Sequence, residues 1–121
     1  MGQDRVRFIE HKGKRILLVD VSHCSAAEVE KISRLVPSFI SSEPKGSVLV
    51  LGDFTGAAVT KQTAEALKQS TVFDRPYLKR SAWVGTDAIP HVLFENIKSF
   101  SRRDLPTFKT REEALEWLVQ E

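Results

Sequence analysis

The sequence predicts an α/β domain with a mixed, mostly parallel five-stranded sheet and four helices, in the order β-β-α-β-α-β-α-β-α. Three observations lead to this fold class. Short apolar runs rich in β-branched residues alternate with segments whose apolar residues recur at helical spacing. Ser and Thr residues that suit helix N-caps precede several of these segments. Only two residues separate the first two strand-like runs, which is typical of an antiparallel hairpin.

The hairpin strands are predicted at residues 6–11 and 14–20, on either side of Lys12-Gly13. The second run contains RILLV, which is apolar without alternation, as expected for a strand covered on both faces. The first run, VRFIEH, is more mixed in polarity. We therefore expect it to form an edge strand.

The first helix is predicted over residues 25–42. Ser25 and Glu28 form an S-x-x-E capping box, in which each side chain bonds a backbone N–H of the first turn. Pro37 interrupts the helical pattern and is expected to kink or locally reshape the helix. The apolar strand SVLVLGD follows at residues 47–53, and FTGAAV forms a loop after it.

The next helix is predicted to begin near Thr60, which suits an N-cap, with Ala64, Leu67 and Val72 facing inward. The strand SAWVG follows, and Gly85 ends it. This helix and strand continue the alternation that predicts a parallel sheet.

The third helix has Asp87 as its predicted cap, and Ile89, Leu93, Ile97 and Phe100 lie on one helical face. This periodicity predicts that all four apolar residues face the core.

The last strand is the short run LPTF at residues 105–108. Thr110 and Glu113 form a second capping box, which starts the closing helix. Alternating strands and helices imply right-handed crossovers between parallel strands. We expect a single domain over residues 1–121.

The composition is typical of a globular protein, with 41% hydrophobic and 28% charged residues. No apolar run approaches the ~20 residues of a membrane helix, and the first residues lack the apolar stretch of a secretory signal. The single cysteine, Cys24, excludes an intramolecular disulfide and fits a reducing compartment, so we expect a cytoplasmic protein.

The net charge of +2 is too small to indicate a nucleic-acid partner. Basic residues nevertheless gather near the entrances of two predicted parallel strands, which would bring them to one end of the sheet. Such a patch could bind a phosphorylated partner, an anionic lipid head group or RNA; the alternative is that these side chains only solvate loops. Little aromatic character accompanies them beyond Tyr77, which argues against single-stranded nucleic acid. The candidate anion patch comprises Arg75, Lys79, Arg80, Arg102 and Arg103.

The carboxyl ends of the parallel strands form a second candidate site, because open α/β sheets bind ligands there. Asp20 and Asp53 each end a strand, so they could place two carboxylates at one edge, or simply cap turns. His23 and Cys24 follow the first of these strands. They could form a nucleophile pair, or Cys24 could pack in the core while His23 lies in a loop.

Motifs for cofactors and catalysis are missing from the sequence. The three histidines are far apart and lack metal-ligand spacing. No phosphate-binding, dinucleotide-binding or hydrolase motif occurs. We therefore predict no metal, no cofactor and no catalytic residue.

Three segments of the chain resemble the bacterial SpoIIAA-like family: RPYLKRSAWVG, FSRRDLPTF and TREEALEWL. Members of that family are STAS-like proteins related to the CRAL-TRIO lipid-transfer fold. Arg103 takes the position of the family's arginine in a Phe-Ser-Gly-Arg-like turn, and Arg102 stands where the family has glycine. The resemblance implies a STAS-like fold.

In STAS proteins that antagonise anti-sigma factors, a strand leads into Asp-Ser-Ser-Gly, whose second serine is phosphorylated. The nearest match in this chain is Asp53-Phe54-Thr55-Gly56, which puts Thr55 at the phosphoacceptor position. The alternative is a loop in which Thr55 caps a turn, because the helical periodicity places the helix start nearer Thr60.

The resemblance and the missing catalytic motifs lead to two functional expectations. The first is a non-catalytic STAS-like regulatory or protein-interaction module, with a protein partner or a second copy of the chain. The second is a protein that binds a small apolar molecule or lipid between helices and sheet. A chain of 121 residues leaves little volume for a lipid unless the helices open or two chains combine.

Overall fold

The computed structural model describes residues 5–102 and 105–120. Five strands form one sheet in the spatial order β1-β2-β3-β4-β5. β1 pairs antiparallel with β2, and the other neighbours are parallel, which confirms the mixed, mostly parallel sheet and the edge position of β1. The strands are β1 (Val6–His11), β2 (Lys14–Asp20), β3 (Val48–Asp53), β4 (Leu78–Val84) and β5 (Thr107–Phe108).

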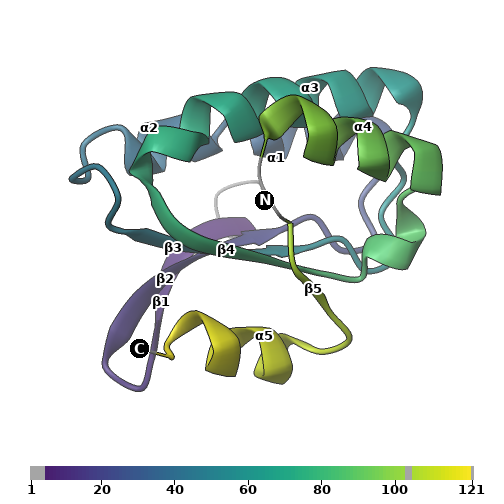
Figure 1. Ribbon diagram of the computed structural model, residues 1–121. Helices are drawn as coiled ribbons and strands as arrows, with labels where there is room; N and C mark the ends of the chain where they lie inside the picture. Colours follow the sequence, from purple (N-terminus) through teal and green to yellow (C-terminus); the bar gives the residue numbers. More distant parts are fainter. Residues whose placement is uncertain (1–4, 103–104, 121) are drawn as a thin grey trace.

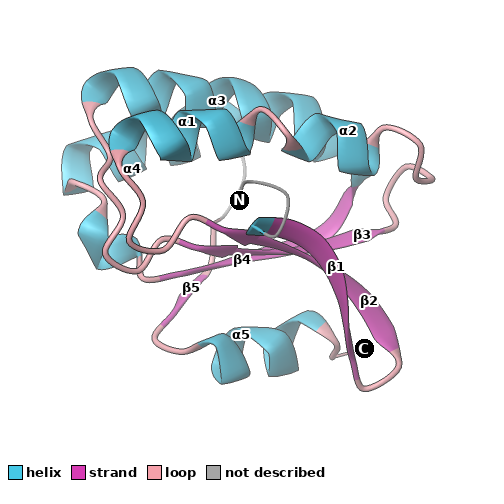
Figure 2. Cartoon of the chain, turned by 180° about the vertical axis from the view of Figure 1, so that it is seen from behind, coloured by secondary structure: helices cyan, strands magenta, loops and turns pink. Residues whose placement is uncertain are grey.

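The helices cover the two faces of the sheet unequally. Figures 1 and 2 show α1 to α4 over one face and α5 alone on the other. The four predicted helical segments are present, and the first is divided into two short helices. The helices are α1 (Ala26–Ser33), α2 (Val36–Ile40), α3 (Lys61–Asp74), α4 (His91–Ser101) and α5 (Arg111–Leu118).

The handedness of the crossovers explains this distribution. The parallel strands follow one another in space as they do in sequence, from β2 to β5. Right-handed connections that all step in the same direction place their helices on the same face. α5 follows the last strand, so no crossover fixes its side, and it packs on the opposite face (Figure 2).

Two apolar cores result, one on each side of the sheet. Leu17 and Val50 point toward α1 to α4, whereas Leu18 and Leu51 point toward α5. Successive side chains of a strand alternate between faces, so a strand covered on both faces has no polar alternation. This confirms the interpretation of the RILLV run.

Local signals at the helix starts are confirmed in part. Ser25 and Glu28 form the complete capping box of α1, and Thr60 is the N-cap of α3. Thr110 accepts from the N–H of Glu113, but the Glu113 carboxylate accepts from Lys109 rather than from the cap residue.

Two predictions about helix boundaries need correction. Asp87 does not cap α4, because it lies in a separate 3₁₀ turn, Thr86–Ala88, and Pro90 is the N-cap residue of α4. The predicted single helix over residues 25–42 is divided into α1 and α2; the expected local reshaping at Pro37 is present, because the proline lies in the first turn of α2, where it is tolerated.

The predicted inward orientation of Val72 and Phe100 is wrong: their exposed fractions are 40% and 56%. In α4 the buried stripe runs through Ile97 to Ser101, which is fully buried, so Phe100 turns outward. In α3 the last buried positions are polar, Thr71 and Asp74. Hydrophobic periodicity misses an inward face that carries polar residues.

Candidate functional site at the carboxyl edge of the sheet

Two matching turns end β2 and β3. Asp20 and Asp53 are register partners in this parallel pair. Each carboxylate accepts hydrogen bonds from the residue two positions later: Asp20 Oδ1 from Ser22 N (3.0 Å) and Oγ (2.6 Å), and Asp53 Oδ1 from Thr55 N (3.0 Å) and Oγ1 (2.7 Å). The structure thus brings the two carboxylates together and also uses both as turn caps.

Arg111, the first residue of α5, bridges the remaining carboxylate oxygens. Its Nε lies 2.6 Å from Asp53 Oδ2, and its Nη2 lies 3.2 Å from Asp20 Oδ2. Arg5 approaches Asp20 Oδ1 at 3.5 Å and donates to the carbonyl of Ser22 at 3.0 Å. The forked guanidinium group of Arg111 therefore links the start of α5 to the ends of β2 and β3.

Electrostatics favour the ionised form of the Asp20 carboxylate. Partial burial raises the pKa of Asp20, but hydrogen bonds from Ser22 and the nearby charges of Arg111 and Arg5 outweigh it, and the net pKa lies below its usual value. The Asp53 side chain is only 8% exposed and is paired with Arg111. These carboxylates serve as anchors for α5 and for the two turns.

The loops after β2, β3 and β4 lie against one another without space between them. The N–H of His23 donates to the carbonyl of Thr55 at 2.8 Å. A Cβ at Gly56 would collide with the His23 ring, and one at Gly85 would lie 2.5 Å from Thr55 N. Because both glycines also have positive φ, the close approach of these loops depends on them.

His23 and Cys24 lie in different surroundings. His23 is exposed in the loop, whereas Cys24 is 4% exposed and belongs to the core beneath α1 to α4. Burial is the main cause that raises the pKa of the Cys24 thiol, so the thiol stays protonated near neutral pH.

Thr55 is exposed, and its hydroxyl is bonded to Asp53. Thr60 caps α3, whose N-terminal amides therefore lie beyond Thr60 rather than at Thr55. A phosphate on Thr55 would therefore lie beside the Asp53 carboxylate rather than at the N-terminus of α3.

Two residues of the candidate anion patch, Arg75 and Arg80, donate hydrogen bonds to backbone carbonyls at the carboxyl ends of helices. Arg75 Nη1 donates to the carbonyl of Ser101, at the end of α4, at 3.1 Å. Arg80 Nη1 donates to the carbonyl of Trp117, near the end of α5, at 2.7 Å. Lys79 is exposed, Arg102 is the C-cap residue of α4, and Arg103 lies outside the described residues.

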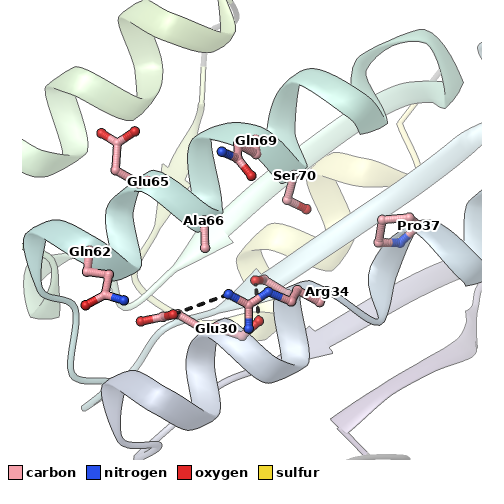
Figure 3. A pocket seen from close by; sticks show the side chains of 9 residues that line it. Glu30, Arg34, Pro37, Gln62, Glu65, Ala66, Gln69 and Ser70 are labelled. Carbon is pink, nitrogen blue, oxygen red and sulfur yellow. Dashed lines mark hydrogen bonds and ion pairs between the residues drawn. The ribbon is translucent and has the colours of Figure 1, made fainter.

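A polar groove runs between α1 and α3 and has a volume of about 360 Å³. Figure 3 shows Arg34 and Glu30 on its α1 wall, where they form an ion pair of 3.5 Å, and Gln62 and Gln69 on α3. The groove is lined mainly by polar side chains, unlike the apolar sites that usually hold small molecules.

The space between helices and sheet is small. An apolar cavity of about 50 Å³ lies there, lined by residues such as Val50, Leu67 and Trp83. A cavity that accepts benzene has a volume of about 150 Å³. Lipid binding would therefore require the helices to open.

Sequence reasoning missed Arg111, Ser22 and Arg5. The available signal was the repeated Asp-x-Ser/Thr pattern after two neighbouring strands, Asp20-Val21-Ser22 and Asp53-Phe54-Thr55. Within residues 5–102 and 105–120, no group of three His, Cys, Asp or Glu residues could hold a metal ion, and no helix is long and apolar enough to cross a membrane.

Comparisons with protein-family models, with curated proteins and with solved structures find no match to this chain.

Proposed function

We propose that the chain is a non-catalytic STAS-like regulatory or protein-interaction module that binds its partner with the outer surface of α3 and α4. The β-β-α-β-α-β-α-β-α order and the three segments that resemble the SpoIIAA-like family support the STAS-like part of this proposal. The bonded carboxylates at the carboxyl edge support a structural rather than a chemical role for that edge.

One observation carries the interaction surface. Among the described residues, all the large hydrophobic side chains that are clearly exposed lie on two adjacent helices. Such a concentration on two adjacent helices is typical of a site for another macromolecule. These residues, which we call the α3–α4 apolar face, are Val72, Phe73, Val92 and Phe100.

Contacts across the helix pair show that part of this face is continuous. Lys68 of α3 places its Nζ 5.6 Å from the Phe100 ring of α4. Val72 follows Lys68 by four residues, so it lies on the same side of α3. Phe73 stacks on Tyr77 at 5.9 Å between ring centroids, which holds one exposed aromatic in place.

The experiment compares the wild-type chain with a Phe73→Ser, Phe100→Ser double variant. Burying one phenylalanine at an interface contributes about 2 kcal/mol, which corresponds to a roughly 30-fold change in affinity. We expect quantitative affinity capture to recover a protein that the double variant loses. For a second copy as partner, sedimentation velocity should show a concentration-dependent dimer that the variant lacks.

A Gln69→Ser, Asn96→Ser variant is the matched control, because both residues are exposed positions on the same two helices. It should behave like the wild type. Equal recovery and equal sedimentation of wild type, control and double variant would refute the α3–α4 apolar face as the partner site.

A further inference from the structure

We propose that the chain has a binding site for a phosphate group in a hollow beside the amino-terminal half of β4. The hollow has a volume of about 340 Å³. Of the described residues that line it, three are cationic, Arg75, Lys79 and Arg80, and none is acidic. This site lies outside the α3–α4 apolar face.

An irregularity in β4 gathers two of these cations. Val48 of β3 pairs with Leu78, but the next residue, Leu49, pairs with Arg80, so Lys79 is an extra residue in β4. Consecutive side chains of a regular strand point to opposite faces, whereas Lys79 and Arg80 both line the hollow. A bulge of this kind redirects a side chain locally.

The two arginines are held in place by helix carboxyl ends. Arg75 donates one N–H to Ser101 and Arg80 donates one to Trp117, whose ring also lies 5.1 Å from the Arg80 guanidinium. A guanidinium has five N–H groups, so each arginine keeps donors for a ligand. Side chains that are already ordered lose less entropy when they bind.

The charge of the hollow matches a phosphate group. The carboxyl end of a helix carries about half a negative charge, so α4 and α5 together offset about one of the three positive charges. About two positive charges remain, and a phosphate monoester carries about −1.5 to −2 at pH 7. The nearest acidic residue in sequence, Asp74, lines the interior cavity rather than the hollow.

The shape of the hollow suits a ligand that enters from solvent. β5 pairs with β4 only at Trp83 and Val84, so the earlier part of β4 borders the hollow instead.

The phosphate could belong to a soluble phosphate ester or to a lipid head group, and the experiment separates these sources.

The experiment is a ¹H–¹⁵N NMR titration of the full chain with sodium phosphate at pH 7, compared with sodium chloride at equal ionic strength. We expect saturable shifts at the amides of residues 75 and 77–81 and at the Trp117 indole with phosphate only. No saturable shift up to about 50 mM phosphate would overturn the proposal, because a site with a dissociation constant of ~1 mM would then be nearly full.

Variants test the location. Lys79→Glu reverses an exposed charge and should weaken phosphate binding by about tenfold or more. Lys61→Glu, an exposed lysine at the opposite end of α3, is the matched control and should bind like the wild type. Arg80→Gln keeps an N–H donor for Trp117 and should also weaken binding. Equal affinity of Lys79→Glu and wild type would refute the site.

Vesicles separate the two sources. Phosphatidylcholine vesicles with phosphatidic acid should broaden the same signals if the ligand is a lipid head group. A soluble phosphate ester is the ligand if inorganic phosphate shifts these signals and the vesicles leave them unchanged.

Discussion

Arg111→Ala should destabilise the chain by ~2–3 kcal/mol. The substitution removes bonds of 2.6 Å to Asp53 and 3.2 Å to Asp20. Removing one partner of a buried ion pair costs about 3–5 kcal/mol, because the other charge stays buried. Asp53 fits that description with an 8% exposed side chain, but Asp20 and Arg111 are 19% and 37% exposed, so solvent screening reduces the cost.

Urea and thermal unfolding followed by circular dichroism measure this loss. For a chain of this length, 1 kcal/mol corresponds to about 4 °C in Tm, so we expect a decrease of about 8–12 °C. Arg111→Lys keeps the charge without the planar fork and should lose about half as much. A loss below ~0.5 kcal/mol for Arg111→Ala would show that the network does not anchor α5, and the reasoning would be wrong.

Three further predictions concern the carboxyl edge. Gly85→Ala should lower the free energy of unfolding by about 3 kcal/mol, because its Cβ would lie 2.5 Å from Thr55 N. Gly46→Ala is the control: Gly46 has the same φ of +72°, but no atom lies within 4 Å of its Cβ position, so the loss should be only about 1 kcal/mol. The folded-state pKa of Asp20 is lowered, so its contribution to stability is present above about pH 4 and is lost as the pH falls further. In acid unfolding, Asp20→Asn should therefore make the free energy of unfolding fall less steeply with decreasing pH. An unchanged slope of unfolding free energy against pH would contradict this prediction. Cys24 should react with a thiol reagent at least about 100-fold more slowly in the folded chain than in the chain unfolded in urea, because it is buried and its pKa is raised. Similar reaction rates in the two conditions would contradict the core position of Cys24.

The fold was predictable where local chemistry decides the structure. The Ser25–Glu28 box and the Thr60 cap locate two helix starts, because a cap residue must bond the amides next to it. The hairpin and the parallel strands follow from short apolar runs and their spacing. Such signals act within a few residues, so the sequence displays them directly.

The side of the sheet on which α5 packs was not predictable, and the candidate site depends on it. The handedness rule applies to helices between parallel strands, and within residues 5–102 and 105–120 no strand follows α5. Arg111 meets Asp20 and Asp53 only because α5 lies on the face toward which both aspartates point. Sequence reasoning therefore located the two carboxylates at one edge but missed the cation between them.

The two ends of the sheet differ in how their charges are satisfied. At the carboxyl edge, Asp20 and Asp53 are met by an arginine fork and by turn donors, so little charge remains for a ligand. At the amino end of β4, Arg75 and Arg80 donate to backbone carbonyls at the carboxyl ends of α4 and α5, whose dipoles offset about half a positive charge each, and no acidic residue is among the described residues that line the hollow. A full anionic ligand is better matched to the second arrangement. Although ligands of open α/β sheets usually bind at the carboxyl edge, the charge distribution in this chain favours an anion at the opposite end.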